Sequence, residues 1–347
     1  MQVVIHEYKN QSRVFNQIES LYSYVSDSEF MFSDILWLDE SFTDLCNILK
    51  SKLHIFREPK IKHFDYPTIK VQNVPKDITI CLSGGKDSAA AAFYYKKLGY
   101  NVHLYHAHGI NKAYGDEKTA AAKIAKYLGC DLHIDDFNIL GRNYFIEHPL
   151  KNYIIANGAI HYALAMGYAP VIAFGNFAQS SIDFNEFEVC GGDCIEMWDA
   201  YKKIIQRVIP NFDIQIPLQT NSDTFELLSE DFDLLKLAVS CMSPYRFRAH
   251  WKHRAEEKYN VRIFENRCGV CWKCCLEWMW LADHDKIEYN ERFYIHCYEI
   301  LERTIFKETG SPADSVQDVW DNYMFYPIEQ SKAYDLLKDR KILQGFH

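Results

Sequence analysis

The sequence has no apolar run long enough to span a membrane, for which about 20 consecutive apolar residues are needed. Its longest weakly polar stretch, residues 154–175, is interrupted by Asn157, by His161 and by a Gly-Tyr-Ala-Pro turn at 167–170. The first residues carry neither the charged nor the apolar region of a signal peptide. We therefore expect a cytoplasmic protein that does not insert into a membrane.

An excess of positive charge is also missing. The 347 residues include 38 Lys and Arg against 47 Asp and Glu, which gives a formal net charge of −9. A protein that binds a nucleic-acid backbone over a long stretch needs a basic footprint, so the charge disfavours nucleic acid as a partner and favours a nucleotide or another small molecule. The chain has no internal repeat, and its 48% of apolar residues can fill a sizeable core.

A Walker A loop is absent, but another glycine-containing turn stands between a strand pattern and a helix pattern. The apolar run 78–82 is followed by Ser83-Gly84-Gly85-Lys86-Asp87-Ser88 and then by the alanine-rich segment 89–95. Two glycines let the backbone approach an anion, and the N–H groups and dipole of a helix start favour negative charge there. The turn therefore predicts a phosphate site, with an ordinary capped turn as the alternative.

The side chains of the turn suit the chemistry of ATP. Ser83 and Ser88 add hydroxyl donors, Lys86 supplies a mobile positive charge, and Asp87 can hold a Mg²⁺ that bridges phosphate oxygens. We expect Lys86, Asp87 and Ser88 to be catalytic and the whole stretch from Leu82 to Ser88, including Gly84 and Gly85, to bind ATP. The motif resembles the PP-loop of ATP pyrophosphatases, enzymes that split ATP into AMP and pyrophosphate.

Strand and helix patterns alternate after the turn. Strands are predicted at 101–107, 131–134, 170–174 and 213–216, and helices at 117–128, 152–166 and 195–208. This order predicts an α/β fold, a Rossmann-like doubly wound parallel sheet of the PP-loop or HUP type. Ligands of such sheets bind at the carboxyl ends of the strands, so we expect His106, His108 and Gly175 to join the ATP site.

Four cysteines form the second strong pattern. Cys268, Cys271 and Cys274 are spaced by two residues, and Cys241 lies upstream. Thiolates at this spacing can surround one tetrahedral ion, so we expect these four to bind a structural zinc, while Cys275 points away. Buried free cysteines and an iron–sulfur cluster are the alternatives. The chain has eleven cysteines and no export signal, so we expect them to be metal ligands or free thiols rather than disulfides.

The ends differ from the middle, which suggests four parts. We expect an N-terminal extension at 1–77, an ATP-binding domain at 78–240, a zinc module at 241–285 and a C-terminal helical extension at 286–347. Within the last part, helical patterns cover 292–306, 316–323 and 329–343.

With these features in place, the stretch from 78 to about 285 resembles the 7-cyano-7-deazaguanine synthases of the queuosine pathway. The resemblance rests on an ordered series of motifs: the loop at 83–88, the acidic helix start at Glu117, His148-Pro149-Leu150-Lys151-Asn152, Gly175, Gly192-Asp193-Cys194, Ile216-Pro217-Leu218, and Ser240-Cys241 with Cys268 to Cys274. It implies ATP, Mg²⁺ and Zn²⁺ as cofactors and Glu117, Lys151, Asn152 and Asp193 as substrate-binding residues.

The resemblance also implies a reaction. A carboxylate, 7-carboxy-7-deazaguanine in that family, is adenylated by ATP and captured by ammonia to give the amide. A second ATP then drives the dehydration of the amide to the nitrile. Because Gln2 follows the first methionine, we expect no N-terminal cysteine nucleophile of a glutaminase, and we expect ammonia to come from solution or a partner.

Departures from the family pattern leave the acceptor open. Lys151 replaces an arginine, Gly192 replaces a proline, residues 221–223 replace a lysine-bearing helix start, and Cys241 and Cys268 are 27 positions apart. One alternative is an anti-phage enzyme that couples a deazaguanine acid to a protein or another amine. Others are a transfer-RNA thiolation or ligation enzyme that relays sulfur through Cys190 and Cys194, and a non-enzymatic ATP sensor or scaffold. The oligomeric state stays open, a homo-oligomer included.

Three further groups have ordinary interpretations. The histidines at 103, 106 and 108 are interpreted as packing or nucleotide contacts and not as a metal site. The tryptophans at 272, 278 and 280 are interpreted as the small core of the zinc module, and the acids at 231 and 233 as a solvated helix face.

Overall fold

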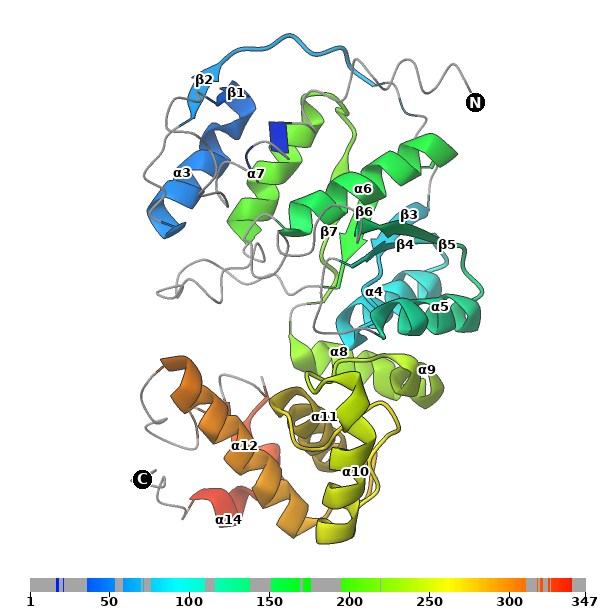
Figure 1. Ribbon diagram of the computed structural model, residues 1–347, viewed down its shortest axis with the longest axis vertical. Helices are drawn as coiled ribbons and strands as arrows, with labels where there is room; N and C mark the ends of the chain where they lie inside the picture. Colours follow the sequence, from blue (N-terminus) through cyan, green and yellow to red (C-terminus); the bar gives the residue numbers. More distant parts are fainter. Residues whose placement is uncertain are drawn as a thin grey trace. The chain divides into compact units, whose positions relative to one another are not determined.

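The computed structural model describes residues 17–18, 21, 36–53, 59–69, 71, 76–109, 116–137, 151–168, 171–175, 195–218, 220–309, 317, 319–320, 324 and 326–338. The chain divides into two compact units (Figure 1). Unit 1 comprises residues 1–83, 91–112 and 129–219, and unit 2 comprises residues 84–90, 113–128 and 220–347. The predicted domain boundaries at 77, 240 and 285 stay predictions.

Unit 1 contains a five-stranded, fully parallel sheet with the order β5-β4-β3-β6-β7. The strands are β3 (Asp77–Cys81), β4 (Asn101–His108), β5 (Leu132–Asp136), β6 (Val171–Phe174) and β7 (Asp213–Gln215). The chain builds outward from β3 to β5 and then returns to place β6 on the other side of β3. The predicted doubly wound sheet is confirmed, with its switch point between β3 and β6.

The central strand β3 is buried along its whole length. Its apolar run suits a position between two neighbouring strands, with Ile80 opposite Leu104 on one side and Ala173 on the other. Helix α6 (Lys151–Met166) packs on β3, β4 and β6. The predicted helix at 152–166 and the strand at 101–107 therefore agree with the structure to within one residue.

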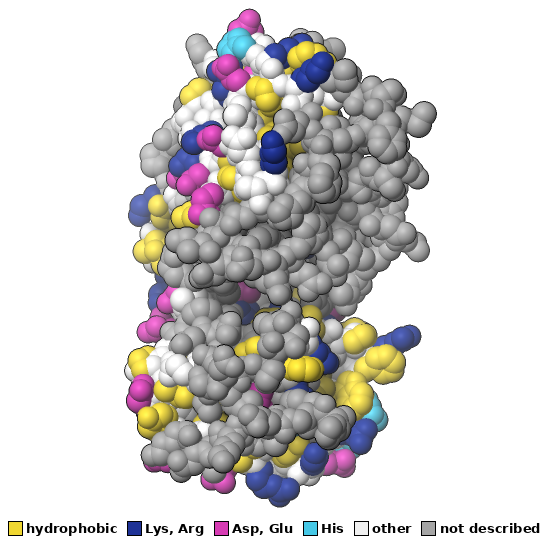
Figure 2. All heavy atoms as spheres, turned by 90° about the vertical axis from the view of Figure 1, so that its left-hand side faces the viewer, with side chains coloured by type: hydrophobic (Ala, Val, Ile, Leu, Met, Phe, Trp, Pro, Cys, Tyr) yellow, Lys and Arg dark blue, Asp and Glu magenta, His cyan; other side chains and the backbone are white. Residues whose placement is uncertain are grey.

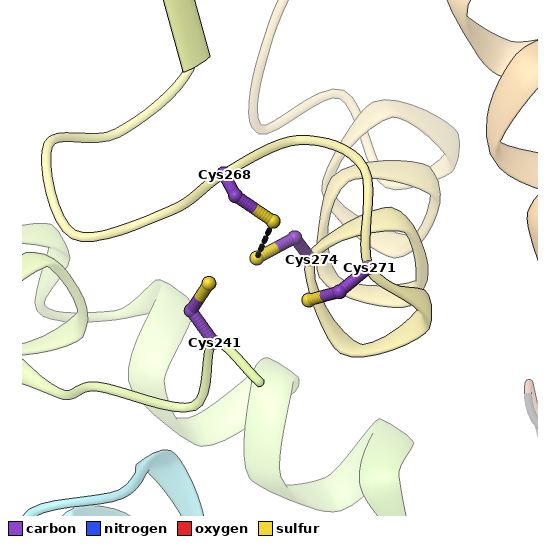
Figure 3. Close-up of side chains that lie close together, drawn as sticks. All are labelled: Cys241, Cys268, Cys271 and Cys274. Carbon is purple, nitrogen blue, oxygen red and sulfur yellow. Dashed lines mark hydrogen bonds between the residues drawn. The ribbon is translucent and has the colours of Figure 1, made fainter. Parts of the chain in front are cut away.

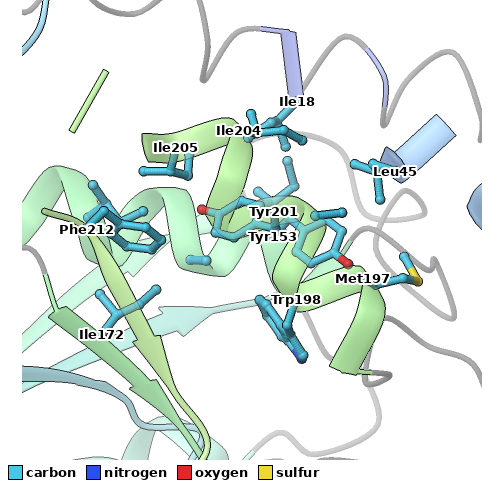
Figure 4. Packing of buried hydrophobic residues seen from close by; sticks show 14 of the residues in the cluster. Ile18, Leu45, Tyr153, Ile172, Met197, Trp198, Tyr201, Ile204, Ile205 and Phe212 are labelled. Carbon is cyan, nitrogen blue, oxygen red and sulfur yellow. The ribbon is translucent and has the colours of Figure 1, made fainter. Parts of the chain in front are cut away.

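An aromatic core lies beside α6 and α7 (Ile195–Gln206), as Figure 4 shows. Tyr153 of α6 stacks on Tyr201 of α7 with ring centres 4.8 Å apart, and Trp198 meets Tyr153 edge to face at 5.0 Å. Such pairs each contribute about 0.5–1.5 kcal/mol beyond the burial of their area. Leu45 of α3 (Thr43–Leu53) belongs to the same buried cluster, so the first described segments share the core of the sheet unit.

Two short strands before the sheet form a separate parallel pair, β1 (Trp37–Asp39) and β2 (Lys60–Lys62). The 3₁₀ turn η1 (Glu40–Phe42) follows β1, and the buried Asp39 carboxylate caps it by accepting from Ser41 N at 3.0 Å. Asp39 also accepts from Phe64 N at 3.0 Å and Arg207 Nε at 3.3 Å, which fixes the segment after β2 against the end of α7.

Unit 2 is helical. Its helices are α5 (Glu117–Leu128), α8 (Asn221–Ser229), α9 (Phe232–Leu237), α10 (Tyr245–Tyr259), α11 (Trp272–Asp283), α12 (Glu291–Thr309) and α14 (Tyr334–Lys338), with the 3₁₀ turn η4 (Ile328–Gln330). Helix α4 (Lys86–Lys97) begins in unit 2, and its later residues belong to unit 1. Helix α11 is buried over nearly its whole length and packs on α8 and α12. Trp278 and Trp280 are buried in this core, as expected, whereas Trp272 is half-buried.

The two acids at the start of α9 differ in their contacts. Asp233 is exposed, as expected, whereas Asp231 is half-buried and its carboxylate caps α9 by accepting from Leu234 N at 3.1 Å and from Tyr127 Oη at 2.8 Å. One prediction for unit 2 needs correction. The predicted helix at 329–343 is interrupted at Ser331, whose hydroxyl hydrogen-bonds Tyr294 Oη at 2.8 Å and accepts from Ala333 N at 3.1 Å.

Among the described residues, no helix has the length and apolar character needed to cross a bilayer.

Candidate functional site

The loop before α4 depends on Gly84. Its φ of +87° is a left-handed conformation that glycine adopts freely. A Cβ on this residue would lie 2.6 Å from the Glu117 carbonyl oxygen and 3.1 Å from both Ala120 Cβ and Ala121 N. Gly84 therefore lets the loop rest on the first turn of α5 and brings the predicted substrate residue Glu117 beside it. A turn that a Cβ would fill is the kind of cradle that lets backbone N–H groups approach an anion.

Lys86 is a buried, paired side chain, so its interpretation as a mobile charge is wrong. It is 4% exposed, and its Nζ donates to Asn221 Oδ1 at 2.6 Å and to Asp87 Oδ1. The ammonium also lies 5.0 Å from the centre of the Phe225 ring. Thr224 Oγ1 donates to the same Asp87 oxygen at 3.3 Å, so the first turns of α4 and α8 are joined by polar contacts. A buried lysine needs such partners because an unpaired charge is costly there.

Ser240 ties the loop to the cysteine cluster. Its Oγ accepts from Lys86 N at 3.0 Å, and the neighbouring Val239 N donates to Gly84 O at 2.8 Å. The Lys86 N–H is at the first residue of α4 and has no partner within that helix, so Ser240 caps the helix from a distant part of the sequence. The next residue, Cys241, belongs to the cysteine cluster. The Ser-Cys motif therefore has a physical role: it couples the loop to the cysteines.

The four predicted ligands lie together (Figure 3). The Sγ atoms of Cys241, Cys268, Cys271 and Cys274 are all within 4.8 Å of one another, and the Cys268 and Cys274 sulfurs are 3.9 Å apart. Cys241 comes from the segment after α9, Cys268 from the turn before α11, and Cys271 and Cys274 from the start of α11. Cys275 lies outside the cluster with its Sγ 3.9 Å from Gly269 O, as expected.

The cluster fits a single tetrahedral ion. Zinc–sulfur bonds of about 2.3 Å set the sulfurs at the corners of a tetrahedron with edges of about 3.8 Å, close to the Cys268–Cys274 distance. Val270 N also donates to Cys268 Sγ at 3.4 Å, the kind of N–H···S contact that supports a thiolate. An iron–sulfur cluster would hold its thiolates farther apart, because several irons and sulfides lie between them. The donor set is therefore suited to a closed zinc site.

A buried ion pair supports the cluster next to its second ligand. Arg267 Nε donates to both carboxylate oxygens of Glu277, at 2.9 and 3.0 Å, and both side chains are buried. The same guanidinium donates to the carbonyl groups of Leu235, at 3.1 Å, and Ala238. Arg267 thus joins α9, α11 and the turn that carries Cys268, and loss of either charged partner would cost about 3–5 kcal/mol.

Lys273 was missed by the sequence interpretation. It lies between two predicted zinc ligands in the first turn of α11. Burial lowers the pKa of its ammonium group, while the carboxylate of Asp87 raises it and the charge of Lys86 lowers it further. Lys273 is therefore within electrostatic reach of the loop. No local pattern distinguishes Lys273 from the other lysines of the chain, and only the fold reveals its neighbours.

The other predicted ATP contacts belong to unit 1. Leu82 O accepts from His106 Nδ1 at 2.8 Å, which places the imidazole of β4 against the end of β3. His108 ends β4 and Gly175 follows β6, so these residues lie at the carboxyl edge of three adjacent strands, as the topology predicts. His103 is a packing residue, stacked on Tyr168 with ring centres 3.4 Å apart. Roles in ATP binding stay predictions.

Only some of the predicted substrate-binding residues lie in the described part of the chain. Lys151 and Asn152 are the first residues of α6 and are half-buried. Asp193, Cys190 and Cys194 lie outside the described residues. The structure therefore brings Glu117 close to the loop and leaves the other substrate contacts as predictions.

Comparisons with known proteins agree with the motifs. No protein-family model matches the chain. The chain is 30% identical to the 7-cyano-7-deazaguanine synthase of Sulfolobus acidocaldarius over 301 residues, which cover 78% of this chain and 61% of that protein. It is 43% identical to the tRNA-5-methyluridine(54) 2-sulfurtransferase of Pyrococcus horikoshii over 58 residues, 16% of this chain and 19% of that protein. The chain thus spans less than two thirds of the curated relatives it matches.

Two solved structures give weaker matches. A predicted subunit of a tRNA methyltransferase from Methanocaldococcus jannaschii is 24% identical and covers 44% of this chain and 75% of its own, with a TM-score of 0.30. The NMN synthetase of Francisella tularensis is 13% identical, and the match covers 69% of this chain and 89% of that protein, with a TM-score of 0.29. The resemblance to the deazaguanine synthases, inferred from the motifs, is confirmed by the sequence comparison.

Proposed function

We propose that the chain is an ATP-dependent carbon–nitrogen ligase that releases AMP and pyrophosphate and acts on a deazaguanine carboxylate. The observation that carries the proposal is the similarity to 7-cyano-7-deazaguanine synthase over 78% of the chain, together with the loop at Gly84 and the four-cysteine cluster. The enzymatic activity, the substrate 7-carboxy-7-deazaguanine and the cofactors ATP, Mg²⁺ and Zn²⁺ are parts of this proposal.

The loop residues have distinct roles in this reaction. The backbone around Gly84 and Gly85 receives the β- and γ-phosphates, which leave together as pyrophosphate. Asp87, whose side chain is 36% exposed, is the carboxylate that would hold Mg²⁺, and the ion would neutralise charge on the phosphate oxygens. Lys86 and Thr224 fix the Asp87 carboxylate before the substrate arrives, so less order has to be created during the reaction.

Positive charge near the phosphates comes from two lysines in this proposal. Lys86 is held by Asn221 and Asp87, so its charge would act on the phosphates from a fixed position. Burial partly desolvates Lys273, whose pKa the charge of Asp87 also influences, and desolvation strengthens the attraction of an ammonium group for an anion. Positioning and charge stabilisation therefore account for most of the proposed catalysis, since phosphate transfer needs little covalent chemistry from the protein.

The structure gives one reason to keep a different acceptor as the second candidate. In the resembled family a lysine stands at the helix start after the Pro-Leu motif, and here this helix start is Asn221, which is committed to Lys86. The start of this helix therefore carries one positive charge fewer than in the resembled family. An amine of a protein or of another molecule, as in an anti-phage conjugating enzyme, is therefore an alternative to ammonia.

Carboxylate-dependent exchange of labelled pyrophosphate into ATP tests the proposal. We expect exchange only when 7-carboxy-7-deazaguanine or a related acid is present, because the adenylate forms reversibly. Asp87→Asn should reduce the exchange rate on the order of 100-fold or more by removing charge stabilisation. The matched control Asp233→Asn, at an exposed position of α9, should retain the wild-type rate.

Two results separate the candidates. Exchange that occurs without any carboxylate, or not at all with the full panel of deazaguanine acids, would contradict the proposed adenylation. If exchange is present, addition of ammonium should yield the nitrile. Adenylate that accumulates with ammonium and disappears with a protein amine would instead support the second candidate.

A further inference from the structure

Helix α10 occupies the long spacing between the first two cysteines of the cluster. Only Arg248 and Ala255 of its 15 residues are buried. Arg248 donates to Ser243 O at 2.8 Å and Cys241 O at 3.0 Å and also pairs with Asp116 of unit 2. One buried arginine therefore attaches the helix to the cysteine cluster. Most of the helix surface does not pack on an apolar core.

The outward side of α10 carries aromatic and basic side chains. Phe247, His250, Trp251 and Arg254 recur at the i, i+3, i+4 and i+7 spacing of one helix face, and Arg246 lies beside them. All five are exposed, and Phe247 and Trp251 have 43% and 38% of their surface accessible. Figure 2 shows hydrophobic, basic and histidine side chains together at its lower right edge. We call these five residues the α10 face.

Neither arginine of the α10 face forms an ion pair with a described carboxylate. No Asp or Glu occurs between Cys241 and Ala255. The ion pairs on α10 involve Arg248, Lys252 and His253, and among the described residues neither Arg246 nor Arg254 has a carboxylate within 4.0 Å. In a chain with a net charge of −9, this local excess of unpaired cations indicates an anionic partner.

A guanidinium group already covers one face of each of the two rings on the α10 face. The Arg246 guanidinium lies 4.6 Å from the centre of the Phe247 ring, and that of Arg254 lies 5.6 Å from the Trp251 ring. A nucleobase stacks on a ring face, and at most one face of each ring is left for it. The ring edges and the guanidinium N–H groups that remain accessible suit apolar side chains and carboxylates.

A basic cavity next to α10 extends the positive surface. It has a volume of about 780 Å³, and its lining includes Lys252 of α10 together with Arg262 and Lys286. Glu265 and Glu288 also line it, so the cavity is less strongly basic than the α10 face. Both features belong to unit 2.

We infer that the α10 face is a docking surface for an acidic, partly apolar polypeptide segment of another protein. Exposed Trp, Phe and Arg are the residues that contribute most to protein–protein contacts. The face spans residues 246–254, which is about two and a half helical turns, and is followed by Glu256 and Glu257. It therefore matches one short segment and not the extended backbone of a nucleic acid. The inference does not depend on the proposed reaction.

Fluorescence anisotropy with defined probes tests the inference on the full-length protein. The first probe is a labelled peptide of 15 residues, the length of α10, that alternates Glu with Leu and Phe. The second replaces each Glu by Lys, and the third is a labelled oligouridylate of similar length. We expect the acidic peptide to bind, the lysine peptide not to bind, and binding to weaken at high salt.

Variants locate the binding surface. Arg246→Glu/Arg254→Glu and Phe247→Ala/Trp251→Ala should each weaken binding of the acidic peptide about tenfold or more. The matched control Arg292→Glu/Lys307→Glu reverses two exposed charges on α12 and should bind like the wild type. All three variants should retain the wild-type pyrophosphate exchange rate, so a failure here is distinguishable from a failure of the proposed function.

Four results would overturn the inference. The first two are no binding of the acidic peptide and equal effects of the α10 and α12 variants on its binding. The third is tighter binding of the oligouridylate than of the acidic peptide, which would indicate a nucleic-acid partner. The fourth is a dimer in light scattering that Phe247→Ala/Trp251→Ala converts to a monomer, which would identify the partner as a second copy of the chain.

Discussion

Replacement of Gly84 by alanine should disrupt the loop for two separate reasons. A non-glycine residue at φ +87° costs about 1–2 kcal/mol. The new Cβ would also lie 2.6 Å from the Glu117 carbonyl oxygen, a backbone atom in the first turn of α5 that cannot rotate away. Overpacking of this kind adds about 1–3 kcal/mol, so we expect a total loss of about 2–5 kcal/mol in the free energy of unfolding.

Gly167→Ala is the matched control for backbone strain. Gly167 has a φ of +75°, and nothing lies within 4 Å of the position its Cβ would take. It should therefore lose only about 1–2 kcal/mol and keep its affinity for ATP. Urea unfolding followed by tryptophan fluorescence gives the stabilities, and equilibrium dialysis gives ATP binding. Equal stability losses in the two variants, with ATP binding unchanged in Gly84→Ala, would refute the proposed contact with α5.

Three further predictions concern the groups around the loop, the metal and the first strands. Ser240→Ala removes the acceptor for Lys86 N–H and should cost about 1 kcal/mol in thermal melts while weakening ATP binding with zinc retained. Cys271→Ser should give insoluble or metal-poor protein in elemental analysis, since structural zinc contributes about 10 kcal/mol or more to small modules; full zinc occupancy would speak against the ligand set. Although burial alone would raise the pKa of Asp39, hydrogen bonds from Ser41 and neighbouring groups lower it below 3.8, so its stabilisation is present above that pH and is lost as pH falls further. Asp39→Asn should therefore have a lower melting temperature than the wild type near neutral pH. In strong acid the two melting temperatures should be equal.

Local patterns were enough to predict the sheet and the cysteine cluster. The strand at 78–82 followed by glycines and a helix pattern, and the spacing of Cys268, Cys271 and Cys274, each specify their geometry within a few residues of sequence. The alternation of strands and helices then predicted that the strands are parallel, because strands joined through helices form right-handed crossovers.

Contacts between distant segments were not predictable in the same way. Lys86 is paired with Asn221, 135 positions away, and Ser240 caps α4 from 154 positions away. Neither contact leaves a periodic signal, so the sequence alone suggested a free lysine. Lys273 was overlooked for the same reason, since its proximity to Asp87 exists only once α11 packs in unit 2.

The products formed from ATP test the central claim most directly. ATP labelled in the adenine ring and in the γ-phosphate is incubated with the protein, Mg²⁺ and 7-carboxy-7-deazaguanine plus ammonium, and the products are separated by chromatography. The proposed adenylation predicts AMP and pyrophosphate, formed only with the carboxylate present and lost in Asp87→Ala with zinc content unchanged. ADP and inorganic phosphate as the main products would contradict the proposed role of the loop, and the assignment of a deazaguanine ligase would fall with it.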